Sequence, residues 1–289
     1  HREMDKAVKN QLAALGFDEI CTFAFLGQEL LTKCGMAKEE RTIEVANPIS
    51  SDLSLMRPSL LPWTLQTVAQ NLRYTPHFRL FELSKIYEKT DGQNHSEKNN
   101  LIALTAGEDF RALEGAMEQL GFRPAVSAST EKPAWHHPGR VADLTIKDKV
   151  VGILYEVHPQ ILKNFDIKEQ VVVAEVDMEE MYALNMDRHP LYHELPRFPS
   201  VQLDVSILIP KKSLAEQYMK AIKKADQSLI AKIDLIDEYT GDKITENERA
   251  LTFSITYQAP DRTLKDEEVK DIHTTVIKTL EMTGAKIRL

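Results

Sequence analysis

The chain concentrates cationic residues in one segment near its C-terminal end. Five lysines and a single glutamate lie along the stretch 211–224, which has helical spacing. A lysine-rich helix face is suited to contact nucleic-acid phosphates, and a solvated helix face is the plainer interpretation of the same pattern. The lysines are Lys211, Lys212, Lys220, Lys223 and Lys224.

Tyr239 is a second candidate contact residue, because it ends a predicted strand immediately before Thr240 and Gly241. An exposed aromatic ring at a strand end can stack on an unpaired base of RNA. Packing at the edge of the protein core explains a tyrosine at this position equally well. The sequence leaves both interpretations open.

Motifs of catalytic chemistry are absent from the sequence. The 289 residues contain no dinucleotide-binding fingerprint, no P-loop and no HExxH pattern. His136, His137 and His158 lack a third ligand at zinc-site spacing. The acidic clusters at 177–180 and 266–268 fit helix starts better than an acid–base pair. We therefore predict no self-contained active site, and no metal or cofactor site, in this chain.

The composition is that of a globular protein without a membrane span. Hydrophobic residues make up 43% of the chain and charged residues 28%, which excludes collagen-like and disordered classes. The formal net charge is −8, but the segment 196–289 holds 15 basic and 15 acidic residues, so RNA contacts there would depend on local patches. Two cysteines and no long apolar run predict a reduced, cytoplasmic protein. The sequence does not begin with methionine, and we expect it to be a fragment of a longer chain.

Hydrophobic periodicity predicts an α+β fold in the first two thirds of the chain. Met4, Val8, Leu12 and Leu15 mark one face of an opening helix that ends at Gly16. Strands are predicted at 19–26, 43–45, 78–87, 101–105, 141–146, 150–157 and 171–176; helices are predicted after the capping residues Ser59 and Asp109, from Pro159, and at 178–184. This order is typical of a mostly antiparallel sheet domain.

A proline-rich segment at 185–199 predicts a linker, so we divide the chain into domains 1–190 and 196–289. In the second domain, alternating apolar residues predict strands from 201, 229 and 251 and a short strand at 286–289. Ser213 is expected to cap the first of two intervening helices, and Thr263 with Asp266 to form a capping box for the second. The order β-α-β-β-α-β is the ferredoxin-like split motif.

Three groups of ordered strings span nearly the whole chain. The first is Asn47-Pro48-Ile49-Ser50, Met56-Arg57-Pro58-Ser59-Leu60-Leu61-Pro62, Asn71-Leu72 and Arg79-Leu80-Phe81-Glu82-Leu83; the second is His137-Pro138-Gly139-Arg140, Val151-Gly152 and Glu156-Val157-His158-Pro159; the third is Arg197-Phe198-Pro199-Ser200, Asp204, Arg262-Thr263-Leu264 and Asp266-Glu267-Glu268-Val269. Together they resemble the C-terminal part of the β subunit of bacterial phenylalanyl-tRNA synthetases.

This resemblance implies a class II synthetase-like domain that has lost its active site, followed by a ferredoxin-fold anticodon-binding domain. It implies a phenylalanine–tRNA ligase in which this chain scaffolds a catalytic α subunit, within an (αβ)₂ heterotetramer, and binds the anticodon stem-loop of the tRNA. ATP and Mg would be bound elsewhere in that holoenzyme, and the family's editing and magnesium-contacting modules lie upstream. Arg79-Leu80-Phe81-Glu82 is a remnant of one ATP-binding motif, and the glycine-rich motif is missing.

The resemblance also assigns roles to individual residues. The family's Phe-Asp-Val-Tyr pattern occurs as Ile236-Asp237-Glu238-Tyr239, so Tyr239 would stack on an anticodon base and Asp237 would accept hydrogen bonds from its edge. A family serine that contacts the same base is replaced by Ala250, which removes one hydrogen bond. Arg249, Arg262 or the lysine helix would meet phosphates.

The resemblance extends to the opening helix, which looks like the family element that packs subunits together. Its apolar stripe of Met4, Val8, Leu12 and Leu15 is therefore expected to face another chain.

Two of the strings depart from the family pattern, because Trp63 and Ser84 stand where the family usually has glycine. Two other functions also remain open. One is a free-standing RNA-binding or assembly module without a synthetase partner. The other is a monomeric synthetase of the organellar type, against which the missing glycine-rich motif argues.

Overall fold

The computed structural model describes residues 1–36, 42–90, 95–126, 133–147, 149–184, 197–241, 244–245 and 247–288. The chain forms two compact units, His1–Arg188 and His189–Leu289, and each is considered by itself. The predicted linker lies outside the described residues up to position 196. The domain bounds 1–190 and 196–289 therefore stay a prediction.

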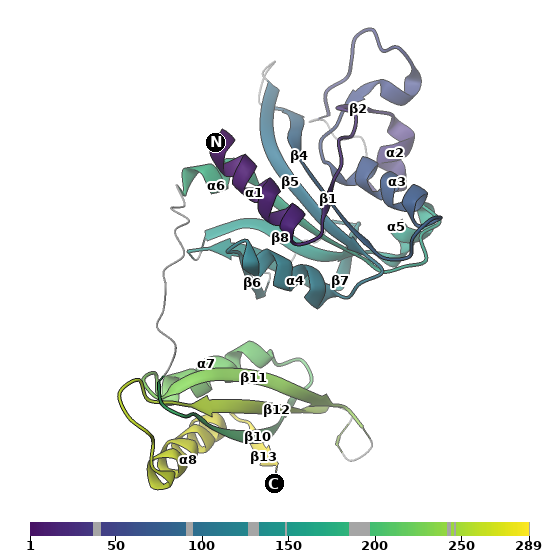
Figure 1. The fold of residues 1–289 in the computed structure, drawn as a ribbon. Helices are drawn as coiled ribbons and strands as arrows, with labels where there is room; N and C mark the ends of the chain where they lie inside the picture. Colours follow the sequence, from purple (N-terminus) through teal and green to yellow (C-terminus); the bar gives the residue numbers. More distant parts are fainter. Residues whose placement is uncertain are drawn as a thin grey trace. The chain divides into compact units, whose positions relative to one another are not determined.

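The first unit is built on a seven-stranded sheet (Figure 1). Every neighbouring pair in it is antiparallel except the first, which confirms the predicted mostly antiparallel sheet. In spatial order the strands are β1 (Asp18–Glu19), β4 (Phe78–Lys89), β5 (His95–Ala106), β9 (Val171–Asp177), β8 (Lys149–Val157), β7 (His136–Ile146) and β6 (Arg123–Val126).

Helices cover both faces of this sheet, so its central strands contribute side chains to two cores (Figure 1). One core takes α1 (Arg2–Ala14), α4 (Phe110–Gln119) and α6 (Met178–Ala183). The other takes α2 (Gln28–Lys33), α3 (Leu61–Asn71) and α5 (Pro159–Asn164). Successive side chains of a strand point to opposite faces, and in β9 Val172 enters the first core while Val173 enters the second.

Local signals set the helix ends as the sequence predicts. The Asp109 carboxylate accepts a 3.0 Å hydrogen bond from the Ala112 N–H at the start of α4. The Ser59 hydroxyl accepts from the Leu61 N–H at 3.1 Å, and Gly16 ends the α1 region with a φ of +82°.

Two predicted strands are wrong. The segment 43–45 forms no strand, because only Glu44 pairs, in an isolated bridge to Leu55. The segment 19–26 divides into β1 and β2 (Phe25–Leu26), because the two ends pair with different partners. Glu19 pairs with Phe81 of the main sheet, whereas Phe25 pairs with Met56 of β3 (Leu55–Met56) in a separate two-stranded sheet. The short helix η1 (Ser51–Leu53) precedes β3.

The second unit has the predicted ferredoxin-like order of elements (Figure 1). Its four strands lie in the order β11-β12-β10-β13, which is antiparallel throughout. The elements are β10 (Val201–Pro210), α7 (Ala215–Ala225), β11 (Ile230–Tyr239), β12 (Glu248–Tyr257), α8 (Asp266–Met282) and β13 (Lys286–Arg288). β12, the third strand of this unit along the chain, lies between β10 and β11, which is the split β-α-β arrangement.

Both helices of this unit lie on one face of the sheet. The capping residues predicted for both helices are wrong. The N-cap residue of α7 is Leu214, which has no side-chain acceptor, and not Ser213. At α8 the Glu268 carboxylate accepts a 3.0 Å hydrogen bond from the Lys265 N–H, so the capping interaction starts two residues later than Thr263. Among the described residues, no helix is long and apolar enough to cross a membrane.

Candidate nucleic-acid interface

The sheet of the second unit has one face packed under its helices and one open face. Val205, Ile207 and Ile209 of β10 enter the core together with Leu251 and Phe253 of β12. The residues between them therefore point to the opposite, open face. The open face carries Gln202, Asp204, Ser206, Leu208, Ala250, Thr252 and Ser254.

Tyr239 and Asp237 reach the open face because β11 contains a bulge. Leu235 pairs with Phe253 and points into the core, but the next register step pairs Asp237 with Thr252 and Tyr239 with Ala250. Without the bulge at Ile236, strict alternation would turn both side chains toward the helices. The bulge leaves Ile236 itself 54% exposed. A second bulge lies between Ile230 and Lys232, where Ile230 is buried and Ala231 is exposed.

The Tyr239 ring meets a cation from the far side of the sheet. The guanidinium of Arg288, in β13, lies 5.3 Å from the ring centroid. Tyr239 also lies against the turn that follows it, since a Cβ added at Gly241 would fall 2.2 Å from the tyrosine hydroxyl. The ring is 36% exposed. An aromatic ring and a guanidinium on an open sheet face can stack on a base and attract its phosphate.

The rest of the open face is polar and internally hydrogen-bonded. Ser206 and Thr252 share a 2.8 Å hydrogen bond, and the Ser254 hydroxyl donates to Asp204 at 2.5 Å. The Asp237 backbone pairs with Thr252, and no described residue forms a hydrogen bond or an ion pair with its carboxylate. Ala250 lies in the same row, between Tyr239 and Leu208, but it is only 3% exposed and presents no surface to a base.

The structure does not bring the two candidate arginines to this face. Arg249 pairs with Glu238 at 2.7 Å and donates to the Ser213 carbonyl at 2.7 Å, on the helix-covered side of the sheet. Arg262 precedes α8 and pairs with Glu268 at 2.8 Å. Both guanidinium groups are thus already neutralised by carboxylates of the same unit.

Three of the five candidate lysines, Lys220, Lys223 and Lys224, lie on α7, in the helical layer opposite the open face. Lys220 pairs with Glu216 at 2.7 Å, and the Lys223 ammonium donates to the Ile230 carbonyl at 2.5 Å. Lys211 and Lys212 lie in the turn between β10 and α7; they and Lys224 are exposed, and no described residue pairs with their side chains. A ligand lying flat on the open sheet would therefore contact Tyr239 without contacting the lysines of α7.

The first unit contains a buried ion pair that sequence reasoning missed. The Arg57 guanidinium lies 2.9 Å from Glu82, and both side chains are at most 3% exposed. Arg57 also donates to Ser84 at 2.5 Å and to the Lys85 carbonyl at 2.8 Å. The only signal was that Arg57 and Glu82 each lie inside an otherwise apolar string. Every donor direction of this arginine is occupied within the protein.

Arg79, the expected remnant of an ATP-binding motif, is likewise occupied. It pairs with Glu108 at 2.9 Å and donates to the Leu15 carbonyl at 3.1 Å. Its side chain lies on the α1 face of the sheet, opposite to Glu82. Neither arginine of these strings points into an open cleft.

A second polar cluster lies under α3. Tyr155 donates to the Glu175 carboxylate at 2.5 Å, and the Ser59 hydroxyl lies 3.4 Å from the same group. Burial raises the pKa of Glu175, although the two hydroxyl contacts oppose that rise. The His136 ring packs on Tyr155 with centroids 3.8 Å apart. Among the described residues no group of three His, Cys, Asp or Glu side chains is placed to hold a metal ion.

The apolar stripe of α1 packs within its own unit. Val8 and Leu12 are fully buried in the core of that unit, and the half-buried Met4 and Leu15 pack against it. The expectation that this stripe faces another chain stays a prediction.

Comparisons with known proteins agree with both halves of the fold. Two family models match: the phenylalanyl tRNA synthetase beta chain CLM domain over residues 1–178, and the ferredoxin-fold anticodon binding domain over residues 196–288. The solved structure of pyrrolysyl-tRNA synthetase from Desulfitobacterium hafniense aligns with a TM-score of 0.51 at 16% identity, covering 66% of this chain and 74% of that one. That likeness supports a class II synthetase-like fold and nothing beyond the fold.

Similar curated proteins carry the description phenylalanine–tRNA ligase beta subunit. The protein of Clostridium tetani is 29% identical over 300 residues, which cover 99% of this chain and 38% of that protein. The protein of Thermotoga maritima is 31% identical over 294 residues, covering 96% and 36% respectively. The chain thus spans less than two fifths of the length of these two relatives.

Proposed function

The chain belongs to the phenylalanyl-tRNA synthetase β-chain family, and we propose on that premise that it is a non-catalytic part of a phenylalanine–tRNA ligase β subunit. In this role it scaffolds a catalytic α subunit and holds the anticodon stem-loop of the tRNA. The assembly would be an (αβ)₂ heterotetramer. ATP and Mg would act in the α subunit.

The open face of the second unit is the observation that carries the RNA-binding part of this proposal. Tyr239 presents a ring to a base, with the Arg288 guanidinium 5.3 Å from its centroid. Asp237, two residues earlier on the same face, would accept hydrogen bonds from the edge of that base. Bases of a single-stranded loop are splayed out and accessible to such a platform.

The exposed lysines in and before α7 would serve a different part of the same RNA. Lys224 lies on α7, and Lys211 and Lys212 lie in the turn before it, so we assign them to phosphates of the stem that flanks the loop. Arg249 and Arg262 would join them only by exchanging their present carboxylate partners for phosphates. Phosphate contacts position the RNA, whereas the Tyr239 platform reads the base.

The interior of the first unit supports a scaffolding role. Arg57 and Arg79 are committed to Glu82 and Glu108, so neither is free to hold a triphosphate. The face of the sheet under α2, α3 and α5 is packed with an apolar core and with polar groups that pair with one another, such as Tyr155 with Glu175. A unit of this kind can support a neighbouring subunit without performing adenylate chemistry itself.

The proposal is tested by replacing Tyr239 with alanine in the ligase that contains this chain. Stacking of an aromatic ring on a base contributes about 1–3 kcal/mol, so tRNA binding should weaken about 5- to 150-fold. The dissociation constant for tRNA and the rate of aminoacylation are the measurements.

Tyr239→Phe is the matched variant, since it keeps the ring and should bind tRNA nearly as well as wild type. Tyr74→Ala removes a tyrosine that is 88% exposed in the first unit and should change nothing. If Tyr239→Ala binds tRNA with unchanged affinity, the stacking role is wrong.

A further inference from the structure

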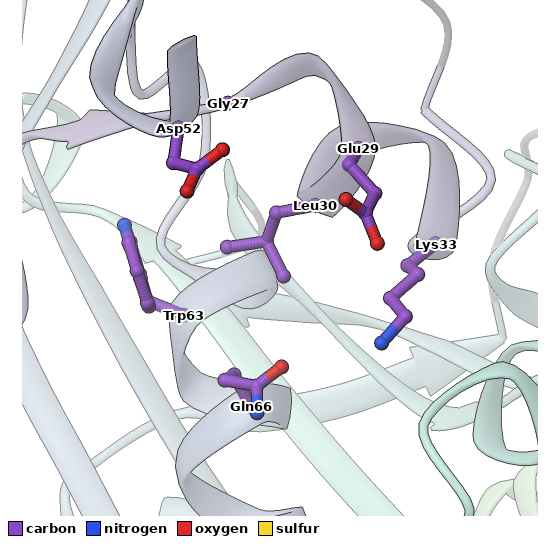
Figure 2. A pocket seen from close by; sticks show the side chains of 7 residues that line it. All are labelled: Gly27, Glu29, Leu30, Lys33, Asp52, Trp63 and Gln66. Carbon is purple, nitrogen blue, oxygen red and sulfur yellow. The ribbon is translucent and has the colours of Figure 1, made fainter. Parts of the chain in front are cut away.

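The first unit carries a pocket on the outer side of its α2–α3 layer. A cavity of about 180 Å³ lies between α2, η1 and α3 (Figure 2). Trp63 and Leu30 form apolar walls, while Glu29 and Asp52 place carboxylates around the same space. Lys33 is the one basic residue among the described residues that line it.

The pocket is shaped by fixed groups. The Trp63 indole N–H donates to the Phe25 carbonyl at 2.9 Å, which sets the orientation of the ring. A Cβ added at Gly27 would lie 2.8 Å from the Cα of Asp52, so the chain before α2 presses directly on η1. A pocket whose walls are held in this way needs little ordering when a ligand enters.

Exposed aromatic surface continues from the pocket. Phe23 is 65% exposed and Phe25 is 40% exposed. The Phe23 and Trp63 rings have centroids 5.8 Å apart, so these two rings form one surface, and Phe25 lies two residues along the chain from Phe23. Scattered apolar residues are ordinary on protein surfaces, but contiguous apolar surface bordered by polar groups marks a contact with another molecule.

The charges around the pocket favour a cation. No described residue forms an ion pair with Glu29 or with Asp52. The Lys33 ammonium, which also borders the pocket, lies 5.6 Å from the ring centroid of Phe165, a residue outside the lining, so the two carboxylates outnumber it there. Two carboxylates beside an indole match a guanidinium or ammonium group, which gains charge-assisted hydrogen bonds and a cation–π contact together. The same carboxylates would repel an RNA phosphate.

We propose that this pocket receives an arginine or lysine side chain of the catalytic α subunit, whose neighbouring apolar side chains pack on Phe23 and Phe25. The proposal rests on the function proposed above, which supplies the partner. An acidic pocket joined to an aromatic surface is complementary to a basic residue flanked by apolar ones. Such an anchor in a preformed pocket is a typical centre of a protein–protein interface.

The test uses the chain assembled with its α subunit. The double variant Glu29→Lys/Asp52→Lys should weaken the affinity between the subunits at least tenfold, measured by titration calorimetry. The matched control, Glu118→Lys/Glu281→Lys, makes the same charge change at exposed glutamates elsewhere and should bind as wild type. Thermal unfolding of each variant checks that its fold is kept.

A carbodiimide cross-link adds a direct readout, because it joins touching carboxylates and amines. Loss of affinity in the pocket variant alone, or a cross-link from Glu29 or Asp52 to a lysine of the α subunit, supports the proposal. Equal binding by wild type and the pocket variant overturns it and leaves the proposed function intact. Failure of the wild-type chain to bind any α subunit overturns the scaffolding function and this proposal with it.

Discussion

The two sheets of this protein differ in how many of their faces are covered. Helices cover both faces of the seven-stranded sheet, but only one face of the four-stranded sheet. A polar strand residue in the first sheet, such as Glu82, must find its partner inside the protein. A polar strand residue in the second, such as Asp237, can keep its hydrogen-bonding capacity for a ligand. Whether helices cover a sheet face thus decides whether the polar groups on that face stabilise the fold or can bind a ligand.

The largest effect is expected from breaking the polar network of the covered sheet. Arg57→Ala would leave Glu82 as an unpaired buried carboxylate, which typically costs about 3–5 kcal/mol of folding free energy. Both tryptophans, Trp63 and Trp135, lie in the first unit, so denaturant unfolding followed by tryptophan fluorescence reports this unit selectively.

Arg79→Ala is the control for that experiment. The side chains of Arg79 and its partner Glu108 are 30% and 27% exposed, so water can solvate the Glu108 carboxylate when the arginine is removed. The expected loss is about 1 kcal/mol or less. If Arg57→Ala and Arg79→Ala lower the free energy of unfolding equally, burial does not make the first ion pair more important to stability than the second.

The second prediction concerns the charge of Glu175 in the same covered sheet. Because burial raises the pKa of this carboxyl in the folded state, the folded protein holds the proton to higher pH than the unfolded chain. The free energy of unfolding should therefore fall as pH rises from the ordinary glutamate pKa through the raised one. Glu175→Gln removes this dependence and keeps an acceptor for Tyr155.

Urea unfolding at a series of pH values measures that difference. The wild type should lose stability relative to Glu175→Gln as pH increases from about 4 to 8. The effect is smaller than that of Arg57→Ala, because protonation can relieve the buried charge of Glu175. A constant difference between the two proteins over this range would contradict the raised pKa.

Much of the fold was predictable because its signals are local. Strict alternation gave β10, the order of elements gave the ferredoxin-like topology, and the Asp109 cap fixed the start of α4. These features depend on neighbouring residues and on spacing. Where partners were distant, prediction failed: the segment 19–26 pairs at its two ends with different strands, so one extended pattern became two short strands.

The sequence allowed the residues of the candidate site to be named, but not their positions relative to one another. Tyr239 and Asp237 could be named from their pattern, yet only the bulge at Ile236 turns them to the open face. A one-residue irregularity has no periodic signature, although it reverses every side chain after it. The Arg57–Glu82 pair was invisible for a related reason, because 25 residues separate its members in the chain.

The third prediction tests whether the two layers of the second unit contact RNA differently. If Lys211, Lys212 and Lys224 meet phosphates, replacing all three with glutamine should lower the salt dependence of tRNA binding. The slope of log K against log salt should fall by about 2 to 3, while Tyr239→Ala leaves the slope unchanged.

The triple variant Lys265→Gln/Lys270→Gln/Lys278→Gln, in and beside α8, makes an equal charge change in the same helical layer. It should leave the salt slope near the wild-type value. Equal slopes for the two triple variants would mean that Lys211, Lys212 and Lys224 act only through net charge.

The smallest effect concerns the two contrasting helix starts. Asp109 caps α4 with its carboxylate, and Asp109→Ala should lower the free energy of unfolding of the first unit by about 1 kcal/mol.

Leu214 begins α7 with an extended backbone and no side-chain acceptor, so a capping side chain would fit at this position. Leu214→Asp should stabilise α7 by about 0.5 kcal/mol, because the gain from capping is partly offset by lost apolar contact of a side chain that is 47% exposed. Amide hydrogen exchange in the first turn of α7 measures the change, with Leu214→Asn as a cap of lower charge. Faster exchange in both variants would mean that Leu214 contributes more through packing than any cap can replace.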